Sequence, residues 1–262
     1  MRYAILLLAL VAALGSQAAD QPDWASHMQE VHAKYKGKPG VVAQWGDSIT
    51  FTMAFWCPLN YGHKNVPAEL ADTEKWLPKY VAKQCWRDWK GPEYGNNSGT
   101  TSDWGLKGAD GWLAKENPEV ALIMWGTNDT KGKLPKEKYK ATIAAIVDKA
   151  LANGTIPVLY TIPPRVSQTT DAAMAAVVES YVAAVREIAT EKKVPLIDFY
   201  KEIMDRQPKD FGKTLMGDEL HPSYTDGHQN SFDDESLKLS GYTLRNFLTL
   251  KMFNDLRGAV LK

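Results

Sequence analysis

The feature that most constrains the fold is an alternation of short apolar runs with longer segments of helical periodicity. Near-continuous apolar runs are typical of parallel strands that are buried on both faces by helices. The sequence therefore predicts a three-layer α/β/α fold around a central parallel sheet. The predicted strands lie at residues 41–45, 119–125, 156–162 and 194–199, and the predicted helices at 135–153, 170–192 and about 240–256.

A chain of 262 residues is long enough to bury a substantial core, and we expect a single domain over residues 20–262. Residues 51–94 depart from the pattern, because proline, charge and tryptophan interrupt them and no apolar run resembles a strand. We interpret this segment as an insertion. The polar stretch at 223–238 is a second unusual segment.

The first residues have the features of an export signal. A short basic start at residues 1–3 precedes an unbroken apolar run at 4–14, and Ser16 and Ala18 supply the small residues that a signal peptidase needs. We therefore predict a signal peptide over residues 1–19 and a secreted or periplasmic mature chain. The alternative is a retained anchor, but the run is too short to span a bilayer comfortably, so no stable membrane association is expected.

Export affects how the two cysteines are interpreted. An oxidising compartment permits a disulfide between Cys57 and Cys85, and the alternative is two buried free thiols.

The formal net charge is zero and the lysines are spread along the chain. Because no basic run gathers on one segment, a nucleic-acid partner is not indicated.

Three short motifs carry the residues suited to chemistry. Residues 46–50 (Gly-Asp-Ser-Ile-Thr) follow the first predicted strand, residues 126–129 (Gly-Thr-Asn-Asp) follow the second, and residues 218–222 (Asp-Glu-Leu-His-Pro) lie near the C-terminus. In folds of this class, ligands bind beyond the carboxyl ends of the strands. The first two motifs are predicted at that edge of the sheet.

These motifs contain the parts of a serine esterase. Ser48 is the candidate nucleophile, His221 the base and Asp218 the acid that orients it, while the Asn128 amide and the Ser48 N–H are candidate oxyanion donors. A third donor is the backbone of Gly99. Taken alone, the first and second motifs are also compatible with simple structural turns.

The other histidines lack such a setting, and we expect surface roles for them. A metal site at His228 with Asp226, Asp233 and Asp234 is less favoured than a solvated acidic loop, because no ligand spacing is recognisable. We predict neither a metal nor a cofactor.

In these motifs the chain resembles the SGNH (GDSL-type) hydrolase superfamily. The resemblance runs from about residue 41 to the C-terminus, with residues 46–50 as the first block, Gly99 as the glycine of the second, residues 126–129 as the third and residues 218–222 as the last. It implies a flavodoxin-like α/β/α sandwich, serine acyl-enzyme chemistry and no cofactor.

The substrate is expected from the sequence only in outline. Eight of the nine tryptophans lie between Trp45 and Trp125, where they either stack on sugar rings or fill the core. We expect an exported carbohydrate O-acetylesterase acting on an acylated glycan or a small acyl ester. The alternatives are a lysophospholipase or thioesterase of the same superfamily, and a non-catalytic carbohydrate-binding protein.

Overall fold

A sheet of four parallel strands forms the centre of the molecule. The computed structural model describes residues 22–132 and 134–261, so the predicted signal peptide at 1–19 lies outside the described residues. The strands follow the order β1-β2-β3-β4, and Val120 lies opposite both Val42 and Ile156. Each predicted strand is confirmed: β1 (Val42–Gly46), β2 (Val120–Met124), β3 (Ile156–Tyr160) and β4 (Leu196–Ile197).

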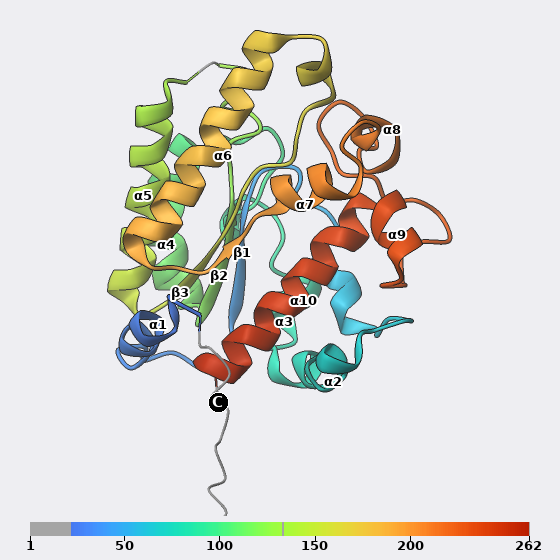
Figure 1. The fold of residues 1–262 in the computed structure, drawn as a ribbon. Helices are drawn as coiled ribbons and strands as arrows, with labels where there is room; N and C mark the ends of the chain where they lie inside the picture. Colours follow the sequence, from blue (N-terminus) through green and yellow to red (C-terminus); the bar gives the residue numbers. More distant parts are fainter. Residues whose placement is uncertain (1–21, 133, 262) are drawn as a thin grey trace, which may run out of the picture.

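Helices cover both faces of this sheet, which confirms the predicted three-layer α/β fold. One face packs against α4 (Ser102–Glu116), α5 (Lys136–Asn153) and α6 (Ala172–Lys192), seen to the left of the sheet in Figure 1. The other face packs against α1 (Ala25–His32) and α10 (Gly241–Ala259). The strands β1, β2 and β3 are fully buried between these layers, as their apolar sequences require.

Local signals set the helix ends. The Asp171 side chain accepts a hydrogen bond from the Met174 N–H and so caps α6, and α5 ends at Gly154, which adopts a left-handed conformation. Between β3 and α10 lie the shorter helices η4 (Val166–Thr169), α7 (Phe199–Arg206), α8 (Phe211–Thr214) and α9 (Asp234–Leu239). No helix of the described residues has both the length and the apolarity needed to cross a bilayer.

The segment 51–94 contains no strand, so the further strand that this fold class leads one to expect before Asn96 is not formed. It folds into η1 (Cys57–Asn60), η2 (Ala68–Leu70), α2 (Ala71–Tyr80), α3 (Gln84–Arg87) and η3 (Pro92–Tyr94). Beyond β1, the described residues extend the sheet by isolated bridges, a parallel one between Gly46 and Asn96 and an antiparallel one between Asn96 and Gly91. In place of the backbone hydrogen bonds of a further strand, the Asn96 side-chain amide donates to the carbonyls of Gln44, Trp89 and Tyr94.

The two unusual segments of the sequence contact each other. The Lys64 N–H donates to the Asn230 carbonyl at 2.9 Å, and the Phe232 N–H donates to the Lys64 carbonyl at 2.9 Å. The helix α10 anchors the first segment, since the Asn246 side chain accepts from the Trp56 N–H and donates to the Ala54 carbonyl. Residues 51–94 and 223–238 are therefore joined to each other and to the last helix.

The expected disulfide is not present. Cys57 and Cys85 are both buried free thiols. Cys57 begins η1, whereas the Cys85 sulfur faces β1 and accepts a hydrogen bond from the Val42 N–H at 3.4 Å. The segment is held instead by the hydrogen bonds described above and by apolar packing, which includes the stacked rings of Trp56 and Trp86 at 4.7 Å.

The tryptophans serve the core and do not form an open platform. Five of the eight between residues 45 and 125 are buried, and the other three are partly buried against the same hydrophobic cluster. Of the two roles considered for these tryptophans, stacking on sugar rings or filling the core, the structure shows the second. The buried ones are Trp45, Trp56, Trp86, Trp112 and Trp125, and the partly buried ones are Trp76, Trp89 and Trp104.

His63 does not have the surface role expected of it. Its side chain is 0% exposed and its ring stacks on Phe232 at 4.1 Å, where the two unusual segments meet. Within the described residues, neither ring nitrogen has a hydrogen-bond partner. Burial lowers the pKa of His63 to about 4, although Glu74 lies 4.0 Å away. Removal of the charged ring from water therefore outweighs this carboxylate.

This histidine is expected to weaken the fold in acid. Because the unfolded chain binds the proton near pH 6.5 and the native state only near pH 4, stability is lost as the pH falls through this window. His63→Phe should reduce the loss of unfolding free energy between pH 7 and pH 5 by about 2 kcal/mol. Urea unfolding of wild type and variant at both pH values measures this. An unchanged loss in the variant, or an equal reduction in the partly exposed control His27→Gln, would contradict it.

Candidate active site

Ser48 lies on a tight turn directly after β1. The Asp47 carbonyl accepts from the N–H groups of Thr50 and Phe51, which makes one helical turn, and the Asp47 side chain accepts from the Ile49 N–H at 3.0 Å. Gly46 permits this turn, because a Cβ there would lie 2.4 Å from the Thr50 hydroxyl and 2.5 Å from the Met124 carbonyl oxygen. The sequence thus places a half-buried serine at the carboxyl end of the sheet.

Two cations from distant parts of the chain hold this turn. Arg245 of α10 is 1% exposed and donates to the Ile49 carbonyl at 2.7 Å and to the Thr50 hydroxyl at 3.3 Å. Its guanidinium also lies 3.5 Å from the centre of the Phe55 ring. Lys90 donates to the Thr50 carbonyl at 3.1 Å. Burial lowers the pKa of Arg245 to about 10, so the group remains charged at neutral pH.

His221 reaches Ser48 from a short, closed loop. Met216 pairs with Pro222, and the Gly217 N–H donates to the His221 carbonyl at 2.8 Å. The His221 Nε2 lies 2.9 Å from the Ser48 Oγ. Residues 173 positions apart in the sequence are therefore within hydrogen-bond distance.

Asp218 organises the same loop and orients the ring. One carboxylate oxygen accepts from the N–H groups of Leu220 and His221, and the other lies 2.8 Å from the His221 Nδ1. Partial burial acts to raise the pKa of Asp218, but the hydrogen bonds from His221 and Leu220 outweigh it, and the net shift is downward. The carboxylate therefore remains ionised beside the imidazole, with Ser48, His221 and Asp218 in one hydrogen-bonded chain.

The candidate oxyanion donors belong to segments that contact the residues just before Ser48, since Asn128 contacts Asp47 and the residues beside Gly99 donate to the Gly46 carbonyl. The Asn128 amide donates to the Thr100 carbonyl at 3.0 Å, and its one other hydrogen bond to a described residue is a long one of 3.5 Å to Asp47, so it retains capacity to donate. Gly99 adopts a left-handed φ of +74° with open space around it. In the described part of the chain, the N–H groups of Ser48 and Gly99 donate to no other group. All three donors are thus available to a ligand oxygen.

Asp129 fixes the loop that carries Gly99. Its buried carboxylate accepts from the Ser102 N–H at 3.1 Å and from the Ser102 hydroxyl at 2.6 Å, at the first residue of α4. A carboxylate at this helix end is favoured by the exposed backbone N–H groups and the helix dipole. Asp129 thereby ties the turn after β2 to the start of α4 and keeps Asn128 near Thr100.

Three further residues support the site without a sequence signal of their own. Arg245 and Lys90 hold the Ser48 turn, as described above. Arg165, after β3, donates to the Thr130 hydroxyl at 2.8 Å and to the Glu219 carboxylate at 3.2 Å. It therefore connects the His221 loop to the turn that carries Asn128. No motif marks these cations, because each acts through contacts made only in the folded chain.

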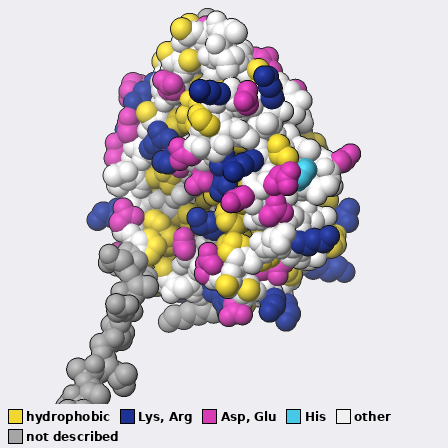
Figure 2. Space-filling view, turned by 45° about the vertical axis from the view of Figure 1, so that its right-hand side comes forward, with side chains coloured by type: hydrophobic (Ala, Val, Ile, Leu, Met, Phe, Trp, Pro, Cys, Tyr) yellow, Lys and Arg dark blue, Asp and Glu magenta, His cyan; other side chains and the backbone are white. Residues whose placement is uncertain are grey.

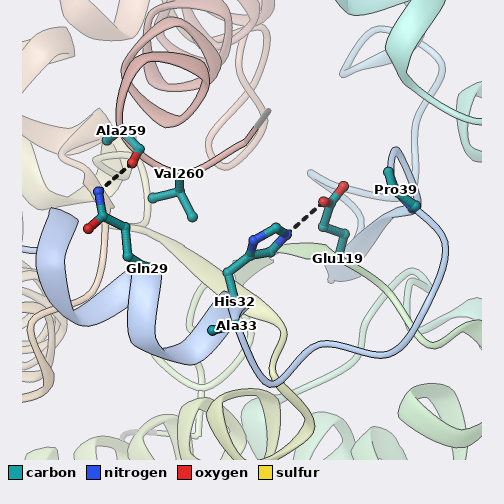
Figure 3. Close-up of a pocket in the computed structure, with 7 residues that line it drawn as sticks. All are labelled: Gln29, His32, Ala33, Pro39, Glu119, Ala259 and Val260. Carbon is teal, nitrogen blue, oxygen red and sulfur yellow. Dashed lines mark hydrogen bonds and ion pairs between the residues drawn. The ribbon is translucent and has the colours of Figure 1, made fainter.

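The cavity around Glu119 lies at the opposite end of the sheet from Ser48. It has a volume of about 440 Å³ and is lined by Gln29, His32, Ala33, Pro39, Glu119, Ala259 and Val260 (Figure 3). Glu119 precedes β2, and it lies 2.8 Å from the His32 ring while accepting from the Gly40 N–H and the Tyr80 hydroxyl. These contacts join four segments of the chain, which gives the carboxylate a structural role.

The surface and the remaining acidic residues suggest no other kind of centre. Cationic and anionic side chains are interspersed on the face seen in Figure 2. Among the described residues no group of histidine, cysteine and carboxylate side chains has the arrangement of a metal site. His228 instead contacts the Ser236 hydroxyl, and Asp233 caps α9.

Comparison with solved structures supports the fold assignment. Acetylxylan esterase Axe2 from Geobacillus stearothermophilus is 17% identical, with a TM-score of 0.56 over 84% of this chain and 96% of that one. A lipase/acylhydrolase from Enterococcus faecalis is 18% identical, with a TM-score of 0.55 over 83% and 95%. The esterase EstA from Pseudoalteromonas is 17% identical, with a TM-score of 0.52 over 80% and 97%. These similarities concern the fold.

Comparison at the level of sequence assigns the family. No curated protein sequence matches significantly. The model of the GDSL-like lipase/acylhydrolase family matches residues 45–229, which include Ser48, Gly99, Asn128, Asp218 and His221. The matched region covers more than half of the chain and runs from the end of β1 past the His221 loop. The chain therefore belongs to the GDSL-like lipase/acylhydrolase family, as its resemblance to the SGNH hydrolases predicted.

Proposed function

We propose that the protein is a serine carboxylic ester hydrolase in which Ser48, His221 and Asp218 form the catalytic triad. The observation that carries the proposal is the continuous chain of contacts from the Ser48 Oγ to the His221 Nε2 at 2.9 Å and from the His221 Nδ1 to Asp218 at 2.8 Å. A serine hydroxyl becomes an effective nucleophile when a base accepts its proton and a carboxylate orients that base.

The proposed reaction uses each of these groups in turn. Ser48 attacks the ester carbonyl while His221 takes the hydroxyl proton, and the N–H groups of Ser48 and Gly99 and the Asn128 amide stabilise the oxyanion. His221 then protonates the leaving alcohol, and an acyl-enzyme remains on Ser48. Water, activated by His221, releases the acid by the same route.

We further propose that the natural substrate is an acetylated glycan outside the cytoplasm. The predicted export signal at residues 1–19 supports the location, because acylated polysaccharides are substrates that an exported esterase meets. The similarity in fold to an acetylxylan esterase is compatible with this substrate. The alternatives are a lysophospholipase or thioesterase and a non-catalytic carbohydrate-binding protein.

A substrate panel tests this proposal. We expect acetate release from acetylated oligosaccharides, and we expect p-nitrophenyl esters to be hydrolysed more slowly as the acyl chain lengthens beyond acetyl. The measurement is kcat/KM across acetyl, butyryl, octanoyl and palmitoyl esters, with an acetylated oligosaccharide in parallel. A preference for long-chain esters would favour the lipolytic alternative, and binding of the oligosaccharide without turnover would favour the binding protein.

A further inference from the structure

The exposed large hydrophobic side chains of the described residues all lie shortly after the nucleophile. They are Phe51, Met53 and Tyr61, which are 38%, 42% and 63% exposed. Exposed apolar side chains that form a contiguous patch on a protein surface often mark a binding site. The tryptophans, in contrast, are packed in or against the core, so Phe51 and Tyr61 are the exposed aromatic rings of the segment that follows Ser48.

Two of these side chains line a cavity that begins at the Ser48 turn. The cavity measures about 370 Å³ and is formed by Phe51, Thr52, Met53, Arg87 and Lys90. The Asp47 carbonyl accepts from the Phe51 N–H, and Lys90 donates to the Thr50 carbonyl. The cavity therefore adjoins the turn that carries Ser48.

The cavity wall carries two cations and no carboxylate. The Arg87 guanidinium donates to the Tyr61 hydroxyl at 3.2 Å, which connects the third exposed ring to this wall. Lys90 donates to the Gln44 amide oxygen at 2.6 Å and to the Thr50 carbonyl. All of these partners are neutral. Within the described residues, neither cation forms an ion pair, and each could still donate to a ligand.

We propose that this cavity is a subsite for a sugar residue that carries a negative charge, either a carboxylate or a sulfate. The inference rests on the proposed acetylesterase function. Beyond its carbonyl carbon an acetyl group has a single methyl group, so a cavity of this size is left for the alcohol part of the ester. Phe51 and Met53 present apolar surface to the sugar ring, and Arg87 with Lys90 faces the anion. A neutral sugar would use the ring surface alone.

The burial of the Lys90 ammonium group and the positive charge beside it are consistent with an anionic ligand. Burial lowers its pKa to about 7, and the neighbouring Arg245 acts in the same direction. No carboxylate of the described residues compensates for this shift. An anion in the cavity would favour the charged ammonium and would supply the missing counter-charge.

Matched substrates isolate the role of the charge. O-acetylated oligogalacturonide and the same oligomer with its carboxylates methyl-esterified share one sugar backbone, and the methyl ester makes each carboxyl neutral at the cost of one added methyl group. The measurement is the ratio of kcat/KM for acetate release from the two. We expect wild type to favour the acidic oligomer by roughly tenfold, since a charge-assisted hydrogen bond is worth about that factor. An acetylated, sulfated oligosaccharide measured alongside identifies which anion is preferred.

Variants then assign the effect to the cavity. Arg87→Gln should bring the ratio close to one, Arg87→Lys should retain part of it, and Lys83→Gln should leave it unchanged, because the exposed Lys83 is near the same helix but does not line the cavity. Equal wild-type rates on the two oligomers, or an unchanged ratio in Arg87→Gln, would overturn the subsite alone. Hydrolysis of p-nitrophenyl acetate without acetate release from any glycan would overturn the proposed glycan substrate and the subsite with it.

Discussion

Ser48→Ala is expected to lower kcat/KM for p-nitrophenyl acetate by roughly 10⁴- to 10⁶-fold. The variant lacks the oxygen that forms the acyl-enzyme, so only hydrolysis assisted by the oxyanion donors remains. The fold should persist, because the one hydrogen bond of the Ser48 hydroxyl in the described residues is its contact with His221. Initial rates at saturating and limiting substrate, together with the thermal midpoint of each protein, measure the effect.

The same experiment tests whether the triad acts as a unit. His221→Ala should lose activity to a similar extent, and the double variant should lose little more than either single one, because residues of one catalytic chain are not additive. The matched control is His27→Ala, which removes a partly exposed histidine of α1. Residual activity near the wild-type level in Ser48→Ala, or full additivity of the two losses, would contradict the proposed mechanism.

Asn128→Ala should reduce kcat by roughly 10²- to 10³-fold, or about 3–4 kcal/mol of transition-state stabilisation, with a much smaller change in KM. The amide is proposed to donate to the oxyanion, a charge that exists only after Ser48 has attacked. Its ground-state partner in the structure is the Thr100 carbonyl. Steady-state kinetics on an acetyl ester separate the two parameters.

A neighbouring asparagine controls for damage to the loop. Asn97→Ala changes a side chain of the segment that carries Gly99. Among the described residues Asn97 bonds only through its backbone, because its carbonyl accepts from the Thr100 hydroxyl and its N–H donates to the Gly46 carbonyl. This variant should retain kcat within a few-fold. An Asn128→Ala variant that raised KM and left kcat intact would show that the amide binds the ground state and would remove it from the oxyanion hole.

The layers of the fold could be predicted from the sequence because their signals are local. The run at 119–125 is apolar throughout and becomes the fully buried β2, and the helical spacing of Ile143, Ile146 and Val147 places those side chains in the core. The candidate site was predictable for a related reason. Ser48 and Asn128 directly follow strands of one parallel sheet, so the fold itself brings their motifs to the same edge.

The remaining features depend on contacts between distant residues. Arg245 lies in α10 among residues that are mostly buried, and nothing in its sequence surroundings indicates that it contacts the Ile49 carbonyl 196 positions away. The disulfide prediction was wrong because it relied on an even number of cysteines, and that number says nothing about the distance between them. In the structure both thiols are free and the Cys85 sulfur faces β1. The tryptophan cluster was ambiguous, because spacing alone does not separate core rings from exposed ones.

The sequence marks the segment after Ser48 as unusual but does not predict its contacts. The Asn96 side chain bonds to the Gln44 carbonyl of β1, and the contact with residues 223–238 runs through the Lys64 backbone and the stacked rings of His63 and Phe232. None of these contacts has a sequence period. They become visible only once the chain is folded.

The most direct test of the central claim is covalent capture of the nucleophile. Wild type treated with a p-nitrophenyl alkylphosphonate should release one equivalent of p-nitrophenol and lose activity, and peptide mass mapping should place the adduct on Ser48, with no adduct in Ser48→Ala. Labelling of another residue, or full inhibition without a covalent adduct, would contradict the assignment of Ser48 as the nucleophile of this hydrolase.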